Sequence, residues 1–298
     1  MSYRPGCTLG AVTDAPALSV VIPAHNERNV IGRTLDSLLR DGPVHPRDEI
    51  IVVANGCSDG TGDVVAEYGD PVRLLNLGVA SKHAALNAGS VAATNPTCAF
   101  VDADVDVTLR ALHDTVAEMA ATGASVGSPE LRLDLAGCSW YARAYYRLWT
   151  RLPWSTIEPV GSGVYILDRA GRDRLGAFPS ATNDDQYVHD LFTESERRCA
   201  RQATFVMRPP RDWKGLVARR TRALAGTREL DERFGALPGR VPHVSLVELI
   251  RRSPRTALDV PVFVAVTIAA KRNAVRKRRR GSNAWERDES SRQQGPTN

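Results

Sequence analysis

The chain is poor in cysteine and has no long apolar run. Its 298 residues include five cysteines, widely scattered, with no C-x-x-C pair among them. This usage argues against a disulfide framework or a zinc site and predicts a reducing, cytoplasmic environment. Residues 1–16 contain no basic segment followed by an apolar run, so we expect no signal peptide. No apolar run reaches about 18 residues, so we expect no membrane-spanning helix.

Basic residues exceed acidic residues, but the excess is confined to one segment. The formal net charge is +5, and residues 271–280 carry seven of the 39 basic residues and no acid. The rest of the chain therefore holds 32 basic residues against 34 acidic ones. A nucleic-acid-binding domain more often carries its positive charge across a folded face, so we expect no nucleic-acid partner.

A mostly apolar segment precedes this basic run. Residues 260–270 are too few to span a bilayer, but an apolar segment beside a polybasic cluster can lie in a membrane interface. The alternative is a solvated basic tail. We therefore assign residues 251–298 to a C-terminal apolar and polybasic tail, disordered beyond Gly281. Peripheral contact with the inner face of the membrane stays open.

The first hundred residues alternate between apolar runs and helical periodicity. The apolar runs are at residues 18–22, 50–54, 74–77 and 98–101, and the helical patterns start at Asn29 and Ala84. Continuous apolar runs are typical of strands that are covered on both faces. The pattern thus predicts an α/β fold with a single, mostly parallel, Rossmann-like sheet flanked by helices.

The second half is less regular. The elements expected there are an aromatic helix at about 139–152, a strand at 164–167 after the glycine loop 161–163, a helix beyond Asn183, a strand at 203–207 and a helix after Trp213. The aromatic helix either supplies a platform for a substrate or packs into the core. We expect this half to form a smaller subdomain.

Polar side chains follow three of the expected strands. They are His25, Asn26 and Glu27 after the first strand, Asn55, Ser58 and Asp59 after the second, and Asp102 and Asp104 after the fourth. Ligands of open parallel sheets bind beyond the carboxyl ends of the strands. An Asp-x-Asp pair offers oxygen ligands that suit Mg²⁺ or Mn²⁺, although such pairs are also frequent in ordinary turns. Residues 18–107 are therefore a candidate nucleotide-binding half.

Five motifs, taken in order, resemble a family-2 glycosyltransferase of the GT-A fold. They are V-V-I-P-A-H-N-E (20–27), V-V-A-N-G-C-S-D-G-T (52–61), S-K-H-A-A-L-N-A-G (81–89), V-D-A-D (101–104) and N-D-D (183–185). The resemblance is strong over residues 17–107 and moderate to about residue 226, and it implies nothing firm about the residues beyond. It implies a GT-A domain over residues 17–250, with a nucleotide-sugar-binding half (17–107) and an acceptor half (108–250).

The resemblance also implies roles for single residues. On the donor side these are Pro23, His25 and Glu27 beside the nucleoside, Asn55 at the base, Asp59 in support of that loop, Lys82 near the diphosphate, Asp102 at the ribose or the metal, and Asp104 as the main ligand of Mn²⁺ or Mg²⁺. Asp185 aligns with the catalytic base and Asp184 takes a position where the family has Glu. A structural alternative is that both acids cap the following helix.

Four cations have two interpretations each. Lys82 either meets the diphosphate or is an ordinary exposed lysine. Arg219, Arg220 and Arg222 either form a diphosphate clamp, since Arg offers phosphate two donors, or belong to a solvated helix face.

Together these features predict an enzyme that transfers a sugar from a UDP- or GDP-sugar to a hydroxyl of a small-molecule, glycan or lipid-linked acceptor. The resemblance implies inversion of configuration and a divalent metal. The Q-x-x-R-W motif of processive synthases is not found in the sequence, which argues for a non-processive enzyme. The alternatives are a polyprenyl-phosphate glycosyltransferase at the membrane surface, a retaining GT-A enzyme, a nucleotide-sugar-binding module without catalysis, and a membrane-associated scaffold.

Overall fold

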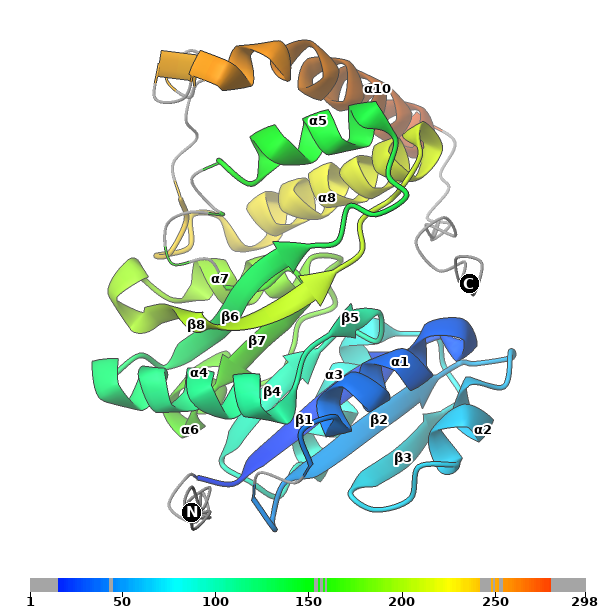
Figure 1. Ribbon diagram of the computed structural model, residues 1–298, viewed down its shortest axis with the longest axis vertical. Helices are drawn as coiled ribbons and strands as arrows, with labels where there is room; N and C mark the ends of the chain where they lie inside the picture. Colours follow the sequence, from blue (N-terminus) through cyan, green and yellow to red (C-terminus); the bar gives the residue numbers. More distant parts are fainter. Residues whose placement is uncertain are drawn as a thin grey trace, which may run out of the picture.

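The computed structural model describes residues 16–42, 45–152, 155, 158, 160–241, 248, 250–251 and 254–279. Figure 1 shows a central sheet with helices on both faces and a further layer of three helices at one end of the molecule. The disorder expected beyond Gly281 concerns residues outside the described ones.

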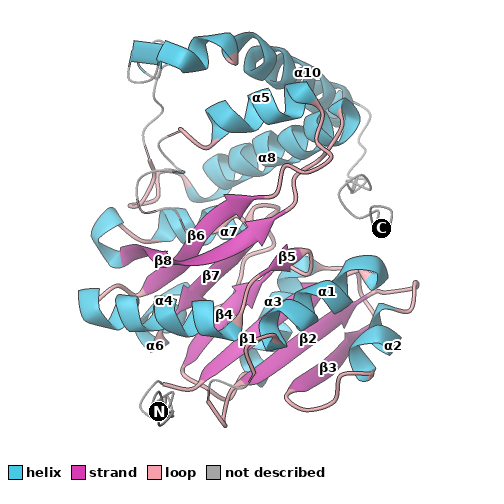
Figure 2. Ribbon diagram, in the orientation of Figure 1, coloured by secondary structure: helices cyan, strands magenta, loops and turns pink. Residues whose placement is uncertain are grey.

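One eight-stranded sheet runs through the molecule in the order β3-β2-β1-β4-β7-β6-β8-β5 (Figure 2). Its strands are β1 (Leu18–Ala24), β2 (Glu49–Asn55), β3 (Val72–Leu77), β4 (Thr97–Val101), β5 (Val105–Asp106), β6 (Val126–Leu133), β7 (Val164–Leu167) and β8 (Arg197–Met207). The first four in spatial order, β3-β2-β1-β4, are parallel, as predicted. Beyond β4 the sheet is mixed, because β7 pairs antiparallel with both β4 and β6, and β5 pairs antiparallel with β8.

The helices follow the sheet in the expected alternation. They are α1 (Arg28–Leu39), α2 (Thr61–Ala66), α3 (Lys82–Ala92), α4 (Leu109–Thr122), α5 (Trp140–Trp149), α6 (Arg169–Leu175), α7 (Asp184–Leu191), α8 (Trp213–Phe234) and α10 (Val260–Arg279), with short 3₁₀ turns at Glu194–Glu196 and Pro254–Leu258. The sequence patterns indicated neither α4 nor β6. β8 begins at Arg197, six residues before the strand that the apolar run predicted.

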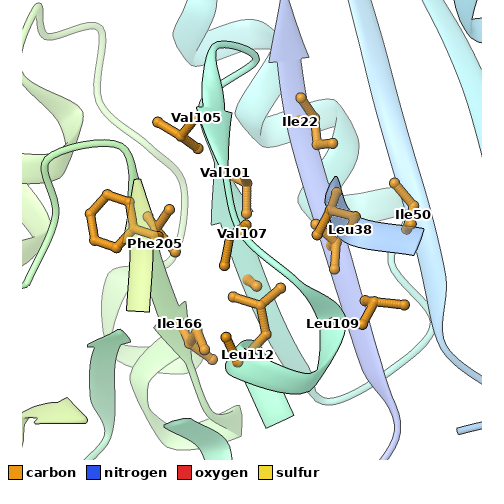
Figure 3. Packing of buried hydrophobic residues seen from close by; sticks show 14 of the residues in the cluster. Ile22, Leu38, Ile50, Val101, Val105, Val107, Leu109, Leu112, Ile166 and Phe205 are labelled. Atoms are coloured by element: carbon orange, nitrogen blue, oxygen red, sulfur yellow. The ribbon is translucent and has the colours of Figure 1, made fainter. Parts of the chain in front are cut away.

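Alternation along the strands divides the core between the two faces of the sheet. In β1, Val20 and Ile22 pack with Leu35 of α1 and Leu112 of α4 on one face, and Val21 packs with apolar residues on the other. Figure 3 shows the first of these clusters from close by, with Ile22 and Leu112 among its labelled members. A continuous apolar run was therefore the correct signal for a strand covered on both faces.

On the second face, α3 lies close against β1. A Cβ atom at Gly89 would come within 2.3 Å of a methyl group of Val21, so only glycine fits there. This close approach brings the first turn of α3 up to the carboxyl ends of β1 and β2, where Ser81 bonds to Asn55.

The helices α5, α8 and α10 form the separate layer. Their shared core contains Tyr145, Leu216, Phe263, Val266 and Ala270, all buried. Residues 260–270, which the sequence placed in a tail, are thus folded into α10 and packed. Within the described residues, no helix is both long enough and apolar enough to cross a bilayer.

Candidate active site

The loops that follow β1 and β2 interlock at the carboxyl edge of the sheet. The buried Asn55 amide donates to the carbonyl oxygen of Ala24 at 2.8 Å, and its Oδ1 accepts from the backbone N–H of Ser81 at 3.0 Å. Asn26 adopts a left-handed conformation (φ 52°), and its Oδ1 accepts from the N–H of Ser58 at 2.7 Å. Asn55 therefore fixes β1, β2 and the start of α3 to one another. Its contact with a nucleotide base stays a prediction.

Asp59 organises the second of these loops. Its carboxylate accepts from the backbone N–H of Arg28 at 3.1 Å and from the N–H and hydroxyl of Thr61 at 3.0 and 2.5 Å. Partial burial acts to raise the pKa of Asp59, but these hydrogen bonds outweigh it and lower the pKa below its ordinary value. The geometry agrees with the expected supporting role of Asp59.

The three residues expected beside the nucleoside differ in accessibility. Pro23 is buried within β1, opposite Val53. His25 is half-buried, and its Nδ1 lies 2.5 Å from the carbonyl oxygen of Asn55. Glu27 is buried, and its backbone N–H donates to Thr61 at 2.8 Å. Of the three side chains, His25 is the one placed at an accessible edge.

The fourth strand end carries the centre of the site, a lysine held between two carboxylates. Lys82, the first residue of α3, places Nζ 2.9 Å from Oδ1 of Asp102 and 2.8 Å from Oδ1 of Asp184. The hydroxyl of the buried Tyr165 donates to the other carboxylate oxygen of Asp184 at 3.1 Å. Residues from α3, β4, β7 and α7 therefore converge, which excludes the interpretation of Lys82 as an ordinary exposed lysine.

The electrostatics of this cluster favour a charged lysine. Burial opposes the ammonium charge, but Asp102 and Asp184 outweigh it, and the pKa of Lys82 rises above its usual value. Burial raises the pKa of Asp184 to about 6, with further contributions from the negative charges of Asp185 and Asp102, while Lys82 acts in the opposite direction. The same burial, with Asp184 next to it, raises the pKa of Tyr165, so that its hydroxyl stays protonated.

A glycine loop joins this cluster to Asp185. Gly161 and Gly163 have φ values of 110° and 108°, and Ser162 between them has φ 60°, a conformation that glycine favours. The backbone N–H of Ser162 donates to Oδ2 of Asp185 at 3.0 Å, and the carbonyl oxygen of Gly163 accepts from the N–H of Asp102 at 2.8 Å. The loop therefore sets the carboxylate of Asp185 beside the end of β4.

Asp185 also serves its own helix in part. Its Oδ1 accepts from the N–H of Gln186 at 2.8 Å, in the first turn of α7. The N-cap position of α7 is Asn183, which makes no side-chain cap bond, so neither acid is the cap residue. Both oxygens of Asp185 accept one backbone bond, and each can accept a second, so this structural role is compatible with a chemical one.

Asp102 and Asp104 are both half-buried, and the residues on either side of Asp104 are buried. The chain at Asp104 is fixed by Arg33, whose Nη2 donates to the Asp104 carbonyl oxygen at 3.2 Å. Among the described residues there is no cluster of three or more side chains that could hold a metal ion. Two neighbouring carboxylates nevertheless fit Mn²⁺ or Mg²⁺, because such ions commonly keep waters and substrate phosphates as their other ligands.

The two arginines expected to form a clamp are placed differently. The guanidinium of Arg219 lies within electrostatic range of Asp104 and Asp185, and its Nη2 is 3.0 Å from Sδ of Met207. Arg222, one turn further along α8, is half-buried. The structure therefore brings Arg219 to the acidic cluster, and the part of Arg222 in a clamp stays a prediction.

A cavity of about 440 Å³ opens on the glycine loop. Its lining includes Ser162 of that loop, Tyr146 and Trp149 of the aromatic helix α5, and Arg201 of β8. The helix divides its aromatic side chains, because Tyr145 instead stacks on Phe263 in the core at a centroid distance of 5.1 Å. Tyr146 also belongs to the buried core, so the core interpretation holds for both tyrosines, and a platform for a substrate stays a prediction.

Tyr165 and the glycine loop are parts of the site that the sequence patterns did not predict. Tyr165 lies in the apolar run V-Y-I-L of β7, where an aromatic residue is typical of the core. The loop offered a usable signal, since a Gly-Ser-Gly triplet before a buried strand requires unusual backbone angles.

Comparison with known proteins agrees with this architecture. Residues 19–163 match the family model "Glycosyl transferase family 2". The chain is 38% identical over 103 residues to validoxylamine A glucosyltransferase of Streptomyces hygroscopicus subsp. jinggangensis, which covers 32% of this chain and 24% of that protein. The match thus spans about a quarter of the length of such curated relatives.

Solved structures resemble the whole fold. The mannosyltransferase PcManGT of Pyrobaculum calidifontis, in complex with GDP-Man and Mn²⁺, superposes with a TM-score of 0.58 at 19% identity, covering 93% of this chain and 83% of its own. Glucosyl-3-phosphoglycerate synthase of Mycobacterium tuberculosis, with Mn²⁺, UDP-glucose and glycerol 3-phosphate, gives a TM-score of 0.52 at 20% identity, covering 83% and 91%.

The sheet order, with these neighbours, defines the GT-A fold. Over residues 19–163, just under half of its length, the chain is similar to glycosyltransferase family 2, which supports the predicted family. The predicted fold class is confirmed.

Proposed function

We propose that the protein transfers a sugar from a UDP- or GDP-sugar to an acceptor hydroxyl, with inversion, in a metal-dependent and non-processive reaction. The observation that carries this proposal is the convergence of Asp102, Asp184 and Asp185 around Lys82 at the carboxyl edge of β4. Support for the donor class comes from the structural neighbours, which hold GDP-Man or UDP-glucose together with Mn²⁺. The cysteine usage supports a cytoplasmic location.

The donor would lie over the carboxyl ends of β1, β2 and β4. His25 is the accessible group at the first strand end, and the loops around Asn55 and Asp59 give that edge a fixed shape. The diphosphate would meet Lys82 and Arg219, two cations that lie close to the acidic cluster. Both are suited to phosphate, Lys as a point charge and Arg through two parallel donors.

Asp104 and Asp102 would hold Mn²⁺ or Mg²⁺, with water and the diphosphate completing the ligand set. A bound ion of this kind offsets the negative charge that grows on a leaving nucleoside diphosphate. Lys82 is already paired with Asp102, so we expect its ammonium to exchange that partner for phosphate oxygens when the donor binds.

Asp185 is the better candidate for the base. One of its carboxylate oxygens is held by the N–H of Ser162, on the loop that lines the cavity, so the group lies next to the space in which we would place the acceptor. It would accept the proton of the acceptor hydroxyl as that oxygen attacks the anomeric carbon and the diphosphate leaves. A single displacement of this kind inverts the configuration.

Asp184 is less suited to that role. Its carboxylate is buried and is engaged by Lys82 on one oxygen and Tyr165 on the other. We therefore assign Asp184 to positioning Lys82. The acceptor, whether small molecule, glycan or lipid-linked, would occupy the cavity beside Trp149 and Arg201.

The test is a panel of UDP- and GDP-sugars, each assayed for binding and for release of the nucleoside diphosphate, with and without Mn²⁺. We expect one donor class to turn over in the presence of the metal, and the product to show inverted configuration by NMR. Retention would remove Asp185 as the base of a single displacement. Donor binding without release for any acceptor would support the binding-module alternative, and no binding of any donor would refute the proposal.

A further inference from the structure

Exposed large apolar side chains gather on one part of the molecule. Among the described residues, five of the seven such side chains belong to the layer of α5, α8 and α10 or to the turn that leads into α10. They are Trp140 (72% exposed), Trp213 (41%), Leu258 (86%), Ile268 (46%) and Val275 (52%). The other two, Val79 and Val91, lie outside this layer. Single exposed apolar residues are normal on a protein surface, but a group of them indicates a contact surface, so we expect this layer to bind a partner.

The helix α10 has two apolar faces with different partners. Phe263, Val266 and Ala270 are buried against α5 and α8. Ile268 and Val275 are two turns apart, so they share the opposite, outward face. The outward face therefore carries two apolar side chains, Ile268 and Val275, that no other described element covers.

The same outward face is strongly basic toward its C-terminus. Lys271, Arg272 and Arg276 are exposed, and none of them forms an ion pair within the described part of the chain. Three more cations follow within α10, and the sequence holds no acid from residue 260 to residue 285. An apolar stripe that continues into uncompensated cations is the composition of helices that lie in a membrane interface.

Two tryptophans stand at the same end of the layer. Tyr141 contacts both of them edge-on, with centroid distances of 5.7 Å to Trp140 and 6.0 Å to Trp213. Figure 1 shows α10 running opposite to α5 and α8, so its basic end lies where those two helices begin. Lys214 is exposed beside Trp213, and the acid nearby, Asp212, is occupied as the cap of α8. Indole rings next to lysine and arginine are typical of the level of lipid headgroups.

We propose that this end of the helical layer, defined by Trp140, Trp213, Ile268, Val275, Lys271, Arg272 and Arg276, docks on an anionic membrane surface. The indole and aliphatic groups would enter the headgroup region, and the cations would meet lipid phosphates. Charge complementarity selects this occupant, because Lys271, Arg272 and Arg276 pair with no acid among the described residues. A nucleic acid would leave the aliphatic stripe in water, which disfavours it. The proposal is independent of sugar transfer.

The experiment is co-sedimentation of the full chain with vesicles of phosphatidylcholine alone or mixed with phosphatidylglycerol. We expect binding to the mixed vesicles that is at least about tenfold stronger than to neutral ones and that weakens as salt is added. The variant R272E/R276E should bind at least about thirtyfold more weakly, since each cation near the surface contributes roughly fivefold. Its matched control is R40E/R110E, two exposed arginines of other elements, which should change binding less than about twofold.

A second pair of variants tests the apolar part. Trp140→Ala should weaken binding at least about fivefold, whereas Val91→Ala, at a residue 88% exposed on α3, should not. Circular dichroism and nucleoside diphosphate release with a soluble acceptor are measured in parallel, because loss of vesicle binding with retained turnover separates this proposal from the catalytic one. Equal binding to neutral and anionic vesicles, equal effects of the two charge variants, or tighter binding to single-stranded RNA than to vesicles would each overturn the proposal.

Discussion

The two sides of the site are held together by different forces. On the donor side, the loops after β1 and β2 are tied through backbone groups, with Asn55 and Asp59 as the side chains that accept or donate the bonds. On the other side, Lys82, Asp102 and Asp184 hold one another through charge. A loop tied through its backbone keeps its shape whatever binds, whereas a charge cluster changes when a phosphate or a proton arrives. Variants of the first kind should therefore lower stability with little effect on turnover, whereas variants of the second kind should change donor binding or turnover as well as stability.

The largest effect is expected at Asp185. Asp185→Asn removes the proton acceptor but keeps a side chain that can bond to Ser162, so donor binding should persist while turnover falls by at least about 10²-fold. Calorimetry for the donor and a diphosphate-release assay measure the two quantities. The control is Asp173→Asn on the exposed face of α6, which should leave both unchanged. Unchanged turnover in the Asp185 variant would remove this residue from the mechanism.

A double-mutant cycle tests the charge cluster. Lys82→Met leaves Asp102 and Asp184 without their shared cation, so donor affinity should fall at least about tenfold and the protein should lose stability. Adding Asp184→Asn to Lys82→Met should restore part of the stability, because the uncompensated buried charge is then gone. Thermal melts of the native protein, the two single variants and the double variant give the coupling free energy between Lys82 and Asp184. Additive effects of the two substitutions on stability would show that the two residues do not act as a unit.

The position of each residue in the sheet explains which residues of the site could be predicted from the sequence. Asp102, Asp104 and Lys82 belong to strand ends or helix starts in a parallel sheet, where topology alone brings them to one edge. Tyr165 could not be found in this way, because its bond to Asp184 joins an antiparallel strand to a helix nineteen residues away. Pairings of that kind depend on the mixed half of the sheet, which no local pattern encodes.

In the helix α10 too, the sequence predicted the chemistry of the segment but not the arrangement of its side chains. An apolar segment followed by cations was visible in the sequence, but the division into buried Val266 and exposed Ile268 was not. That division is set by α5 and α8, with which α10 packs, and by the ion pair of Asp259 with Arg147 at 2.6 Å. The composition thus indicated the surface chemistry, and only the packing defined which side chains present it.

The charge cluster and the donor-side loops should also differ in how their stability depends on pH, and in the cluster the residue that sets this dependence is Asp184. Burial raises the pKa of Asp184 to about 6, so the folded protein holds this proton more tightly than the unfolded chain does. Its contribution to stability is full below the unfolded pKa and is lost as the pH rises toward about 6, above which it is constant. Urea unfolding at several pH values, compared between the native protein and Asp184→Asn, measures how Asp184 changes the free energy of unfolding with pH. If the free energy of unfolding changed with pH in the same way in both proteins, the raised pKa of Asp184 would be contradicted.

The smallest effect is expected on the donor side, at Asp59. Asp59→Asn weakens its bonds to Arg28 and Thr61, and should lower the free energy of unfolding by about 1 kcal/mol at neutral pH with little change in turnover. Because the pKa of Asp59 is lowered in the folded state, this stability is present above the unfolded pKa and is lost as the pH falls through the folded one. The pH trend is therefore opposite to that of Asp184. Asp63→Asn, an exposed acid in the first turn of α2, is the control, and a loss of turnover larger than the loss of stability would break the proposed division between the two sides.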